Sequence, residues 1–569
     1  MKRTVLVTAV AILAVFAPNL IHFGDAAIGG GGSDALKHVW SQWFVHNQLL
    51  SGDGLTLQTR LIHHPSGGAF FSLDTVNALM GFPFRAVFGS VATYNLVVVL
   101  NLFLAALAGA LLTQELTDEP WAAELGGLGF ALSAWVLCFP LASGVSETAA
   151  FWFLPLILLA ALRTWKQPGY LPPVICGVLL CLQGLACWSH GITAGLLLLG
   201  LAAWSGRRDR AGWTDPARLK RFGILLATTL VAVIPLYLAV SGTVSADDAV
   251  KTRTLSLFHS SPLSPLAVPE SNSMAILDFF LPGAWGRRTS SVGTEQLMYA
   301  AHPGFILLGL AFLAFRKRIP QARLLWVGLI AMALMSLGPR IYLDQARTLG
   351  GMPNPVYLAA YWLIPLVNAS IHSVDRFAVG VQLCVALLAA LGLTTVARRW
   401  RPWLLGGVVV ETLLISPGPW PISMVAAAPH PVSTHIAASA EPGAVIDLPF
   451  LQGDGRNTWF LGDVFLQQTF HGKPIPFQLE GHGIETANPL LQQNPYFRSL
   501  STALLQPHPT DTGCDHVSAL YDMNFTWIVW RPTLAPDAAR ASVEDALLRC
   551  LELVTTENGR MLFQIPATP

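Results

Sequence analysis

The sequence has few charged residues for its length. Asp, Glu, Lys and Arg make up 12% of the 569 residues, about half of the share found in a typical soluble domain. Because so few charges cannot cover the surface of a water-soluble protein of this size, the composition excludes a cytosolic enzyme, a disordered chain and a coiled coil. Hydrophobic residues make up 53% of the chain, and its mean hydropathy is +0.52. These values predict a mainly α-helical, polytopic membrane protein.

Several motifs are also absent. No cysteine pair has the C-x-x-C spacing of a metal site. The sequence contains neither a G-x-G-x-x-G after a strand nor a Walker A motif, so we expect no bound nucleotide and no nucleic acid partner. Five of the seven cysteines lie in apolar runs. Only Cys514 and Cys550 lie in the C-terminal part, where a disulfide and two free thiols remain alternatives.

Eleven apolar runs are predicted to span the membrane. They cover residues 4–20, 91–113, 122–140, 147–162, 172–189, 191–205, 222–241, 302–315, 324–337, 376–396 and 403–417. Short connectors rich in Lys and Arg alternate with long connectors that contain few. The positive-inside rule assigns the basic connectors to the cytoplasm. Eleven crossings from a cytoplasmic N-terminus then leave the C-terminal part outside.

The first run has two interpretations. Lys2-Arg3 before a short apolar core, with small residues at Ala26-Ala27, is typical of a cleaved signal peptide. We interpret residues 4–20 as an uncleaved first helix, because no clean A-x-A cleavage site follows.

The chain divides into two predicted regions and a linker. Residues 1–417 form the membrane module, which has large outer loops at 21–90, 242–301 and 338–375. The proline-rich segment 418–432 is predicted to be a linker. Residues 433–569 are predicted to form a small α/β domain outside the membrane.

The predicted α/β domain has clear local signals. Residues 443–450 and 525–530 are strand-like, and Glu557-Asn558-Gly559 indicates the turn of a hairpin. Residues 537–551 have helical spacing of their apolar positions. Acidic and basic residues such as Asp447 and Asp463 alternate with aromatics, which suits contact with a glycan; the alternative is that these groups are structural.

The first outer loop is the richest in candidate functional residues. Ser33-Asp34 indicates a helix start, and the aromatic stripe that follows suits a helix lying at the membrane interface. Asp34 and His38 share a helical face, where they could bind a divalent cation or act as a base and its partner. Further polar residues of this loop are Asp53, Arg60, His63, His64 and Asp74. The alternative is that Asp34 only caps a surface helix and that His38 is solvated.

Other ionisable residues lie at the outer ends of spans. Glu147 is at the mouth of one span, where a charge is costly and usually has a partner or a task. His190 lies between two spans, and His372, Asp375 and Arg376 lie at the outer end of another. The Arg376 guanidinium could grip a phosphate. Alternatives are a structural ion pair for Glu147 and Arg376, snorkelling to the headgroups, and a locally hydrogen-bonded His190.

Together these features resemble the GT-C class of polyprenyl-phosphate-sugar-dependent glycosyltransferases and, more narrowly, bacterial membrane proteins of the YfhO type. The similar stretches are GGSDALKHVWSQWF (31–44), HHPSGG (63–68), ATYNLVVVLNLFLAALAG (92–109), SVDRFAVGVQLCVALLAALGL (373–393), AVIDLPF (444–450) and QQTFHGKPI (467–475).

The resemblance implies roles for particular residues. Asp34 matches the general base that deprotonates the acceptor hydroxyl, and Glu147 matches a second catalytic acid. With Asp34 it would also hold a divalent cation, Mg or Mn. Arg376 would bind the lipid-linked phosphate. The remaining substrate-binding candidates are His38, Arg60, His63, His64, His190, His372 and Asp375. The first loop has no D-x-D, and the adjacent pair Asp247-Asp248 lies in a later loop, so metal dependence stays open.

The expected function is therefore transfer of a sugar from a polyprenyl-phosphate donor to a cell-envelope glycan or lipid. The expected location is the periplasmic side of a bacterial inner membrane, with membrane lipids as further partners. Two other classes stay open: a transporter or flippase of lipid-linked glycans, and a non-catalytic envelope-assembly protein.

Overall fold

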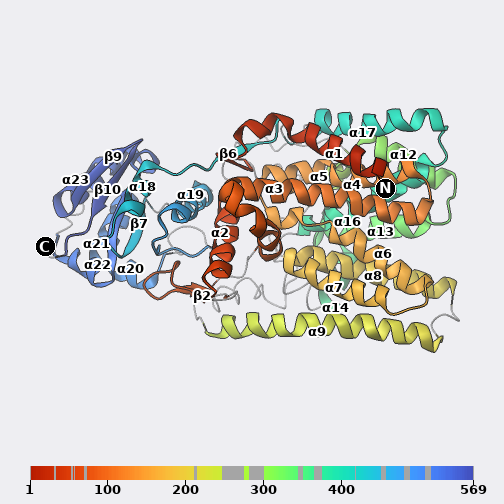
Figure 1. Cartoon of the computed structure of the whole chain (residues 1–569), viewed down its shortest axis with the longest axis horizontal. Coiled ribbons are helices and arrows are strands. Elements are labelled where there is room, and N and C mark those ends of the chain that lie inside the picture. Colours follow the sequence, from red (N-terminus) through yellow and green to blue (C-terminus); the bar gives the residue numbers. More distant parts are fainter. Residues whose placement is uncertain are drawn as a thin grey trace.

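Apolar runs form helices here because a helix satisfies every backbone polar group within its own segment, as a membrane requires. The computed structural model describes the chain except residues 1, 31–33, 53–55, 57, 70–73, 210–213, 247–273, 281–299, 344–349, 364–373, 417, 419, 450–455, 480–486, 506–513 and 568–569. Figure 1 shows an elongated molecule, with a helical bundle at one end and an α/β domain at the other. Most helices of the bundle run roughly along the long axis.

The bundle is built mainly from α-helices, with short 3₁₀ and π segments. Its longer α-helices are α1 (Lys2–Phe16), α3 (Thr75–Thr117), α4 (Pro120–Ala131), α6 (Phe153–Lys166), α7 (Leu171–Ala186), α8 (Trp188–Arg208), α9 (Pro216–Ala246), α12 (Phe305–Arg316), α13 (Ala322–Ser336), α16 (Ala378–Leu393) and α17 (Arg401–Ile415). Shorter elements are η1 (Ala17–His22), α5 (Ala134–Val136), η2 (Leu137–Ala142), η3 (Ser146–Ala149), α11 (Leu277–Phe280), α14 (Pro355–Leu363), η8 (Val374–Phe377) and η9 (Arg398–Trp400). Two small hairpins are formed by β2 (Gln58–Thr59) with β3 (Gly68–Ala69) and by β4 (Arg340–Tyr342) with β5 (Gly350–Pro353).

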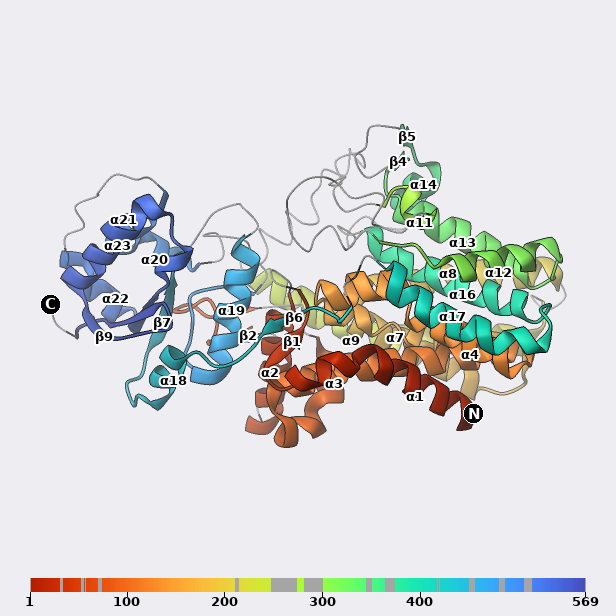
Figure 2. The ribbon, with the colours of Figure 1, turned by 90° about the horizontal axis from the view of Figure 1, so that it is seen from above.

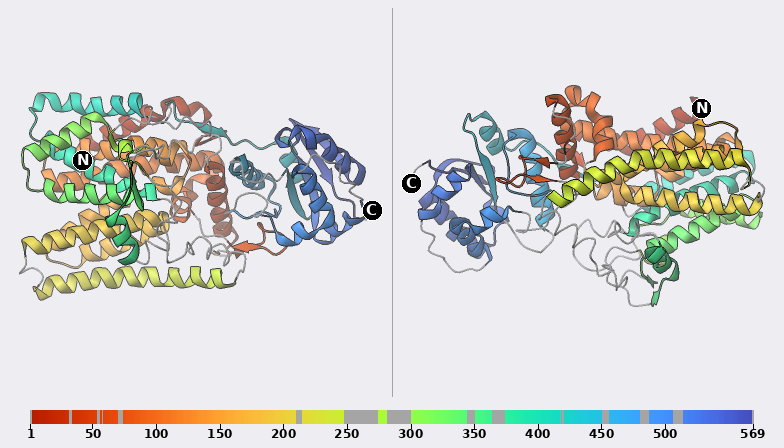
Figure 3. Two further views of the ribbon diagram at one scale, coloured as in Figure 1. Left: turned by 180° about the vertical axis from the view of Figure 1, so that it is seen from behind. Right: turned by 90° about the horizontal axis from the view of Figure 1, so that it is seen from below.

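Each predicted span falls on a helix of this bundle. Within the described residues, five stretches are long and apolar enough to cross a membrane: Lys2–His22, Thr75–Thr117, Pro120–Ala142, Ser146–Lys166 and Val374–Leu393. The predicted helical membrane protein is therefore confirmed, whereas the count of eleven crossings stays a prediction. Helix α9 runs along one edge of the bundle (Figures 1 and 3).

Helix α1 is joined to the bundle by charge as well as by packing. Arg3 Nη2 lies 2.9 Å from Oε2 of the buried Glu124 of α4. The same guanidinium lies over the ring of Trp121. Residues Ile12, Val15 and Phe16 of α1 are buried in the main core. The first apolar run thus has the contacts expected of a permanent helix of the bundle.

Helix α16 lies at the centre of the bundle. All of its residues are buried, and it packs against α4, α12 and α13. At Gly392 the helix comes so close to α12 that a Cβ atom would lie 1.9 Å from the carbonyl oxygen of Leu310. The opposite end of α16 continues into η8, which carries Arg376. The central helix therefore fixes the position of this arginine.

Helix α2 (Ala35–Ser51) begins where the sequence predicts, but its aromatic stripe is covered by protein. It lies across the long axis, between α3 and helix α19 (Arg456–His471) of the C-terminal domain (Figures 1 and 2). Trp40 is fully buried, donates from Nε1 to Gln468 Oε1 at 2.7 Å and packs edge-on against Phe465. The expected lipid-facing aromatic stripe instead packs against protein, because α19 covers it.

The segment predicted as a linker is partly a strand. Strand β6 (Met424–Ala426) pairs antiparallel with β1 (Ala26–Ile28) of the first outer loop. The Asn19 side chain also donates to the carbonyl of Ile422 at 2.6 Å. These contacts attach the segment to the first outer loop and to the end of the first apolar run, and its assignment as a linker stays a prediction.

The C-terminal domain contains a four-stranded sheet of order β7-β8-β10-β9. Its strands are β7 (Ala444–Leu448), β8 (Phe525–Trp530), β9 (Glu552–Glu557) and β10 (Arg560–Gln564). The β7–β8 pair is parallel and the other two pairs are antiparallel. Its other helices are α18 (Pro431–Ala438), α20 (Pro489–Gln493), α21 (Pro495–Leu505), η11 (Cys514–His516), α22 (Ser518–Asp522), η12 (Pro532–Leu534) and α23 (Asp537–Cys550).

The sequence predicts several secondary-structure elements of this domain correctly. The predicted strands correspond to β7 and β8, and the predicted helix to α23. The β9–β10 hairpin turns at Asn558 and Gly559, which both have positive φ as a two-residue turn of this kind requires. The predicted α/β character of the C-terminal part is thus confirmed.

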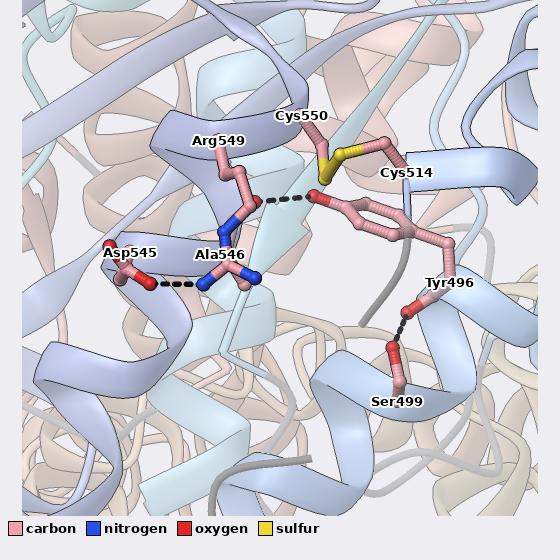
Figure 4. The surroundings of a disulfide bond; sticks show 7 residues. All are labelled: Tyr496, Ser499, Cys514, Asp545, Ala546, Arg549 and Cys550. Atoms are coloured by element: carbon pink, nitrogen blue, oxygen red, sulfur yellow. Dashed lines mark hydrogen bonds and ion pairs between the residues drawn. A yellow bond between two sulfur atoms is a disulfide. The ribbon is translucent and has the colours of Figure 1, made fainter. Parts of the chain in front are cut away.

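The two cysteines of this domain form a disulfide (Figure 4). The bond joins Cys514 to Cys550 across a sequence separation of 36 residues and links η11 to the end of α23. Beside it, the Tyr496 hydroxyl donates to the carbonyl of Ala546 at 3.4 Å. Of the two alternatives left by the sequence, the disulfide is the one present.

A buried charge network connects the sheet to α19. Arg531 donates from Nε and Nη2 to Asp447 Oδ1 at 3.1 and 2.6 Å, and its Nη1 pairs with Asp463. Arg560 of β10 lies 2.8 Å from the same Asp463 carboxylate. Asp447 and Asp463, which the sequence suggested as glycan contacts, are therefore occupied by arginines inside the domain.

We predict that Arg531→Ala destabilises the C-terminal domain by about 3–5 kcal/mol, because two buried carboxylates lose their shared cation. Hydrogen exchange of the β7 and β8 amides in the full-length protein measures this free energy. The control is Arg549→Ala, which removes an exposed pair with Asp545 and should cost about 0–1 kcal/mol. Equal protection in the two variants would contradict the prediction.

The network also makes the stability of the domain depend on pH. Burial raises the pKa of Asp463, but Arg531 and Arg560 more than offset this and hold it below its usual value. The folded-state pKa is thus lower than the unfolded one, so the contribution to stability is complete above about pH 4 and is lost as the pH falls further. In the Arg531→Ala variant, the free energy of unfolding should therefore fall less between about pH 4 and lower pH than in the wild-type protein.

Candidate functional site

Four ionisable side chains meet at the end of the bundle that faces the C-terminal domain. They come from four elements: Asp74 precedes α3, His38 lies on α2, Glu147 on η3 and Arg376 on η8. We call these four residues the outer cluster. Along it, His38 lies between the carboxylates of Asp74 and Glu147, and Arg376 lies on the other side of Glu147.

Asp74 is the buried end of the outer cluster, with a side chain that is 0% exposed. Its Oδ1 accepts from Asn77 Nδ2 at 2.7 Å. Its Oδ2 accepts from Gln42 Nε2 at 3.2 Å and from the Ser146 hydroxyl at 2.5 Å. Burial raises the pKa of Asp74 above its usual value, and His38 and the Ser146 hydroxyl offset part of the rise.

His38 connects Asp74 to Glu147. Its Nδ1 lies 3.8 Å from Asp74 Oδ2, and its Nε2 lies 3.3 Å from Glu147 Oε2. The other oxygen of Glu147 lies 3.3 Å from Arg376 Nη1. The Glu147 side chain is 20% exposed whereas that of His38 is 8% exposed, so the carboxylate of Glu147 is the more accessible of the two.

Asp34 lies beside the outer cluster and is more exposed. It occupies the N-cap position of α2, and its backbone N–H donates to the carbonyl of Ser143. Its Oδ1 is 3.1 Å from Lys37 Nζ, and its side chain is 39% exposed. Among the described residues, no backbone N–H of α2 bonds to its carboxylate, so simple helix capping does not account for this residue.

Two buried groups next to Glu147 have unused hydrogen-bonding atoms. Within the described part of the chain, Arg376 Nε has no hydrogen-bond partner, nor does either ring nitrogen of His190. His190 is fully buried against Trp135, and Arg376 lies over the Phe139 ring. Buried polar atoms without partners are uncommon, so these nitrogens mark the place as one that packing alone does not explain.

Three predicted site residues lie elsewhere. His63 and His64 join the first outer loop to the C-terminal domain: the His63 N–H donates to the carbonyl of Phe477, and His64 Nε2 lies 2.9 Å from the carbonyl of Met523. Burial lowers the pKa of His64, which favours its neutral ring. Arg60 is exposed on the same loop. None of the three reaches the outer cluster, because α2 separates this part of the loop from the bundle.

The remaining predictions have mixed outcomes. Asp375 is buried directly before Arg376 in η8, whereas His372 lies outside the described residues. The described residues contain no group of three or more His, Cys, Asp or Glu side chains placed to hold a metal ion. A role of Asp34 and Glu147 as Mg or Mn ligands therefore stays a prediction.

Gln42, Ser146 and Asn77 were not identified from the sequence, and Asp74 was noted only as one polar residue of the first loop. A signal for Gln42 was available. Asp34, His38, Gln42 and His46 follow one another at intervals of four residues, which places a polar stripe on one face of α2. That stripe faces the start of α3, where Gln42 meets Asp74 and His46 Nε2 lies 2.6 Å from the Ala78 carbonyl.

An apolar cavity of about 900 Å³ lies in the bundle between α6, α7, α8, α9, α13 and α16. Leucines and glycines form most of its wall, together with Trp165, Trp188 and Trp204. Trp188 follows Cys187, whose thiol lies within electrostatic range of Arg376 and Glu147. One end of the cavity is thus close to the outer cluster, and the other reaches Lys166 and Arg208.

No family model matches the chain, and no curated protein matches its sequence. Several solved structures have a similar backbone trace. One is the oligosaccharyltransferase of Archaeoglobus fulgidus in the apo form, which is 12% identical in sequence. Its TM-score is 0.48, and the match covers 94% of this chain and 70% of that one. ArnT from Cupriavidus metallidurans bound to undecaprenyl phosphate has 13% identity and a TM-score of 0.45 over 100% of this chain and 98% of that one. Both are glycosyltransferases of the GT-C class that the sequence resembles, and the YfhO-type likeness stays a prediction.

We predict that Asn77→Ala lowers the stability of the bundle by about 1–3 kcal/mol, because the buried Asp74 carboxylate loses a donor and Asn101 loses its acceptor. Thermal unfolding of the purified protein in detergent measures the change. Gln114→Ala on the same helix is the control, since Gln114 bonds only to the exposed Asp118 among the described residues. An Asn77→Ala variant that unfolds at the temperature of this control would contradict the prediction.

Proposed function

We propose that this protein transfers a sugar from a polyprenyl-phosphate donor to a glycan or lipid of the cell envelope, on the periplasmic face of the inner membrane. The observation that supports this most directly is the outer cluster together with Asp34. Carboxylates and an arginine are gathered at the end of a membrane bundle, where a lipid-linked phosphate would be held. A lone structural ion pair would not require the accessible Asp34 or the unused nitrogens of Arg376 and His190.

The chemistry needs few groups. The acceptor hydroxyl gives its proton to Asp34 while its oxygen forms a bond to the anomeric carbon of the donor. The bond from that carbon to the phosphate oxygen breaks, and its electron pair leaves with the phosphate. Because phosphate is a stable anion, one base and one cation suffice, and Arg376 can pair with the departing oxygen. Glu147, as the second acid, holds Arg376 in place until the phosphate binds.

The apolar cavity suits the hydrocarbon part of such a donor. Its wall is mainly leucine and glycine, and it begins near Arg376 by way of Trp188 and Cys187. An isoprenoid chain in the cavity would leave its phosphate at the outer cluster. The donor would then remain in the lipid phase while its sugar faces water.

The proposed orientation follows from the basic connectors. Four of them lie at the end of the bundle away from the C-terminal domain (Figure 1). They are the connectors between α6 and α7, α8 and α9, α12 and α13, and α16 and α17. The positive-inside rule places this end in the cytoplasm, which leaves the outer cluster and the C-terminal domain in the periplasm.

We predict that Asp34→Asn and Glu147→Gln each reduce transfer by about 10²–10⁴-fold, as expected for the loss of a general base or of a directly coupled acid. The measurement is sugar transfer by the purified protein in liposomes that contain a polyprenyl-phosphate sugar. Parallel reactions with a chelator, and with Mg or Mn restored, test the metal dependence.

The matched control is Asp25→Asn. Asp25 lies before α2, pairs with His22 at 3.6 Å and is 65% exposed. It should keep wild-type transfer. Full turnover by Asp34→Asn would remove that residue from the role of base, and flux of the donor across liposomes without any new covalent product would favour a transporter instead.

A further inference from the structure

Asp74 has no role in the transfer as proposed, yet it is the most deeply buried acid of the outer cluster. Its position at the N-cap of α3 would ordinarily mean that its side chain bonds to the first backbone N–H groups of that helix. Among the described residues it makes no such bond. Its oxygens accept instead from Gln42 on α2, Asn77 on α3 and Ser146 on η3. Helix capping therefore does not explain why a carboxylate is buried here.

The donors to Asp74 are themselves held in place. Asn77 accepts from Asn101 Nδ2 at 2.7 Å, and Asn101 accepts from Trp152 Nε1 at 2.9 Å. Asn77 Nδ2 also donates to the Ser146 carbonyl at 3.0 Å. All three hydrogen-bond partners of the Asp74 carboxylate donate to it, which suits its ionised form. The His38 ring lies next to this carboxylate, with Nδ1 3.8 Å from Oδ2.

We propose that Asp74 is a positioning residue, which holds His38 so that the imidazole in turn holds Glu147 beside Arg376. This inference deepens the proposed function and rests on it for the purpose of the site. Asp74 lies at one ring nitrogen of His38, at 3.8 Å, and Glu147 lies at the other, at 3.3 Å, so the ring stands between the two carboxylates. Carboxylate–imidazole pairs commonly orient a third group in this way.

The arrangement determines which oxygen of Glu147 meets which partner. Oε2 faces His38 and Oε1 faces Arg376, at 3.3 Å in each case. When a phosphate pairs with Arg376, Oε1 of Glu147 loses its partner, whereas Oε2 of Glu147 still contacts His38. Glu147 then keeps its place at the site during the reaction instead of following the arginine.

Other charged or titratable groups also face this region. They are Asp34 and Lys37 on α2, Tyr94 on α3, Asp375 on η8 and Cys187 before α8. None of these side chains bonds to both Asp74 and Glu147 in the described part of the chain. Two connections join the carboxylates: the His38 ring between them, and Ser146, which donates to Asp74 and directly precedes Glu147 in η3. The test must therefore change Asp74 and His38 and observe Glu147.

The experiment measures the reactivity of Glu147 in the purified full-length protein. The protein is treated with a water-soluble carbodiimide and glycine ethyl ester, and labelling of the Glu147 peptide is followed by mass spectrometry. We expect Asp74→Asn and His38→Gln each to accelerate this labelling several-fold, because Glu147 Oε2 no longer has an imidazole held beside it. The double variant should resemble the faster single variant, since both changes break one connection. Asp25→Asn, which alters an exposed Asp–His pair, should leave the rate unchanged.

Labelling of Glu147 at the wild-type rate in both single variants would overturn the inference, as would rates that multiply in the double variant. His38→Gln leaves the three donors to Asp74 in place, so it tests the connection even where Asp74→Asn does not fold. In the transfer assay, both variants should lower kcat by about 10–100-fold with a KM for the donor within twofold of wild type. Faster labelling in a protein without transfer activity would refute the proposed function but not the positioning; transfer with unchanged labelling would do the reverse.

Discussion

The structure depends on the pairing of charges that the protein has withdrawn from water. At the bundle end that faces the C-terminal domain, the His38 ring lies between the carboxylates of Asp74 and Glu147, and Arg376 pairs with Glu147. An isolated charge at such a depth would be strongly unfavourable, so each carboxylate is held by neighbouring polar groups. The same solution recurs in the C-terminal domain, where Arg531 satisfies Asp447 and Asp463. The two networks differ in accessibility, because Glu147 remains partly exposed and the Asp447–Arg531–Asp463 group does not.

Helix α2 links the two parts of the molecule. One face carries the polar stripe that meets α3, and the aromatic side chains of Trp40 and Phe44 belong to the core of the C-terminal domain. Gln468 of α19 accepts from Trp40 and donates to the carbonyl of Leu61. The position of Asp34 and His38 is consequently set by the C-terminal domain as well as by the membrane bundle.

The sequence was sufficient for features that depend on local pattern. Apolar runs bounded by turn residues located β7, β8 and the β9–β10 hairpin, and Ser33-Asp34 located the start of α2. It was not sufficient for the face on which a residue lies after packing. His38, His63 and His64 belong to one loop, yet α2 directs His38 toward the bundle while the two others bond to the C-terminal domain. The burial of α2 beneath α19 depends on segments more than 400 residues apart, which no local periodicity records.

The close approach at Gly392 has a consequence for the whole length of α16. This helix is buried throughout and begins directly after η8, which carries Arg376. Its 16 residues, at 1.5 Å per residue, put this beginning about 24 Å from its last turn. Any side chain larger than hydrogen at Gly392 would displace the carbonyl of Leu310 or slide the helix along its axis. Gly392, which has no Cβ methyl group, thus affects where the Arg376 guanidinium lies along the bundle axis, although the two residues are at opposite ends of the bundle.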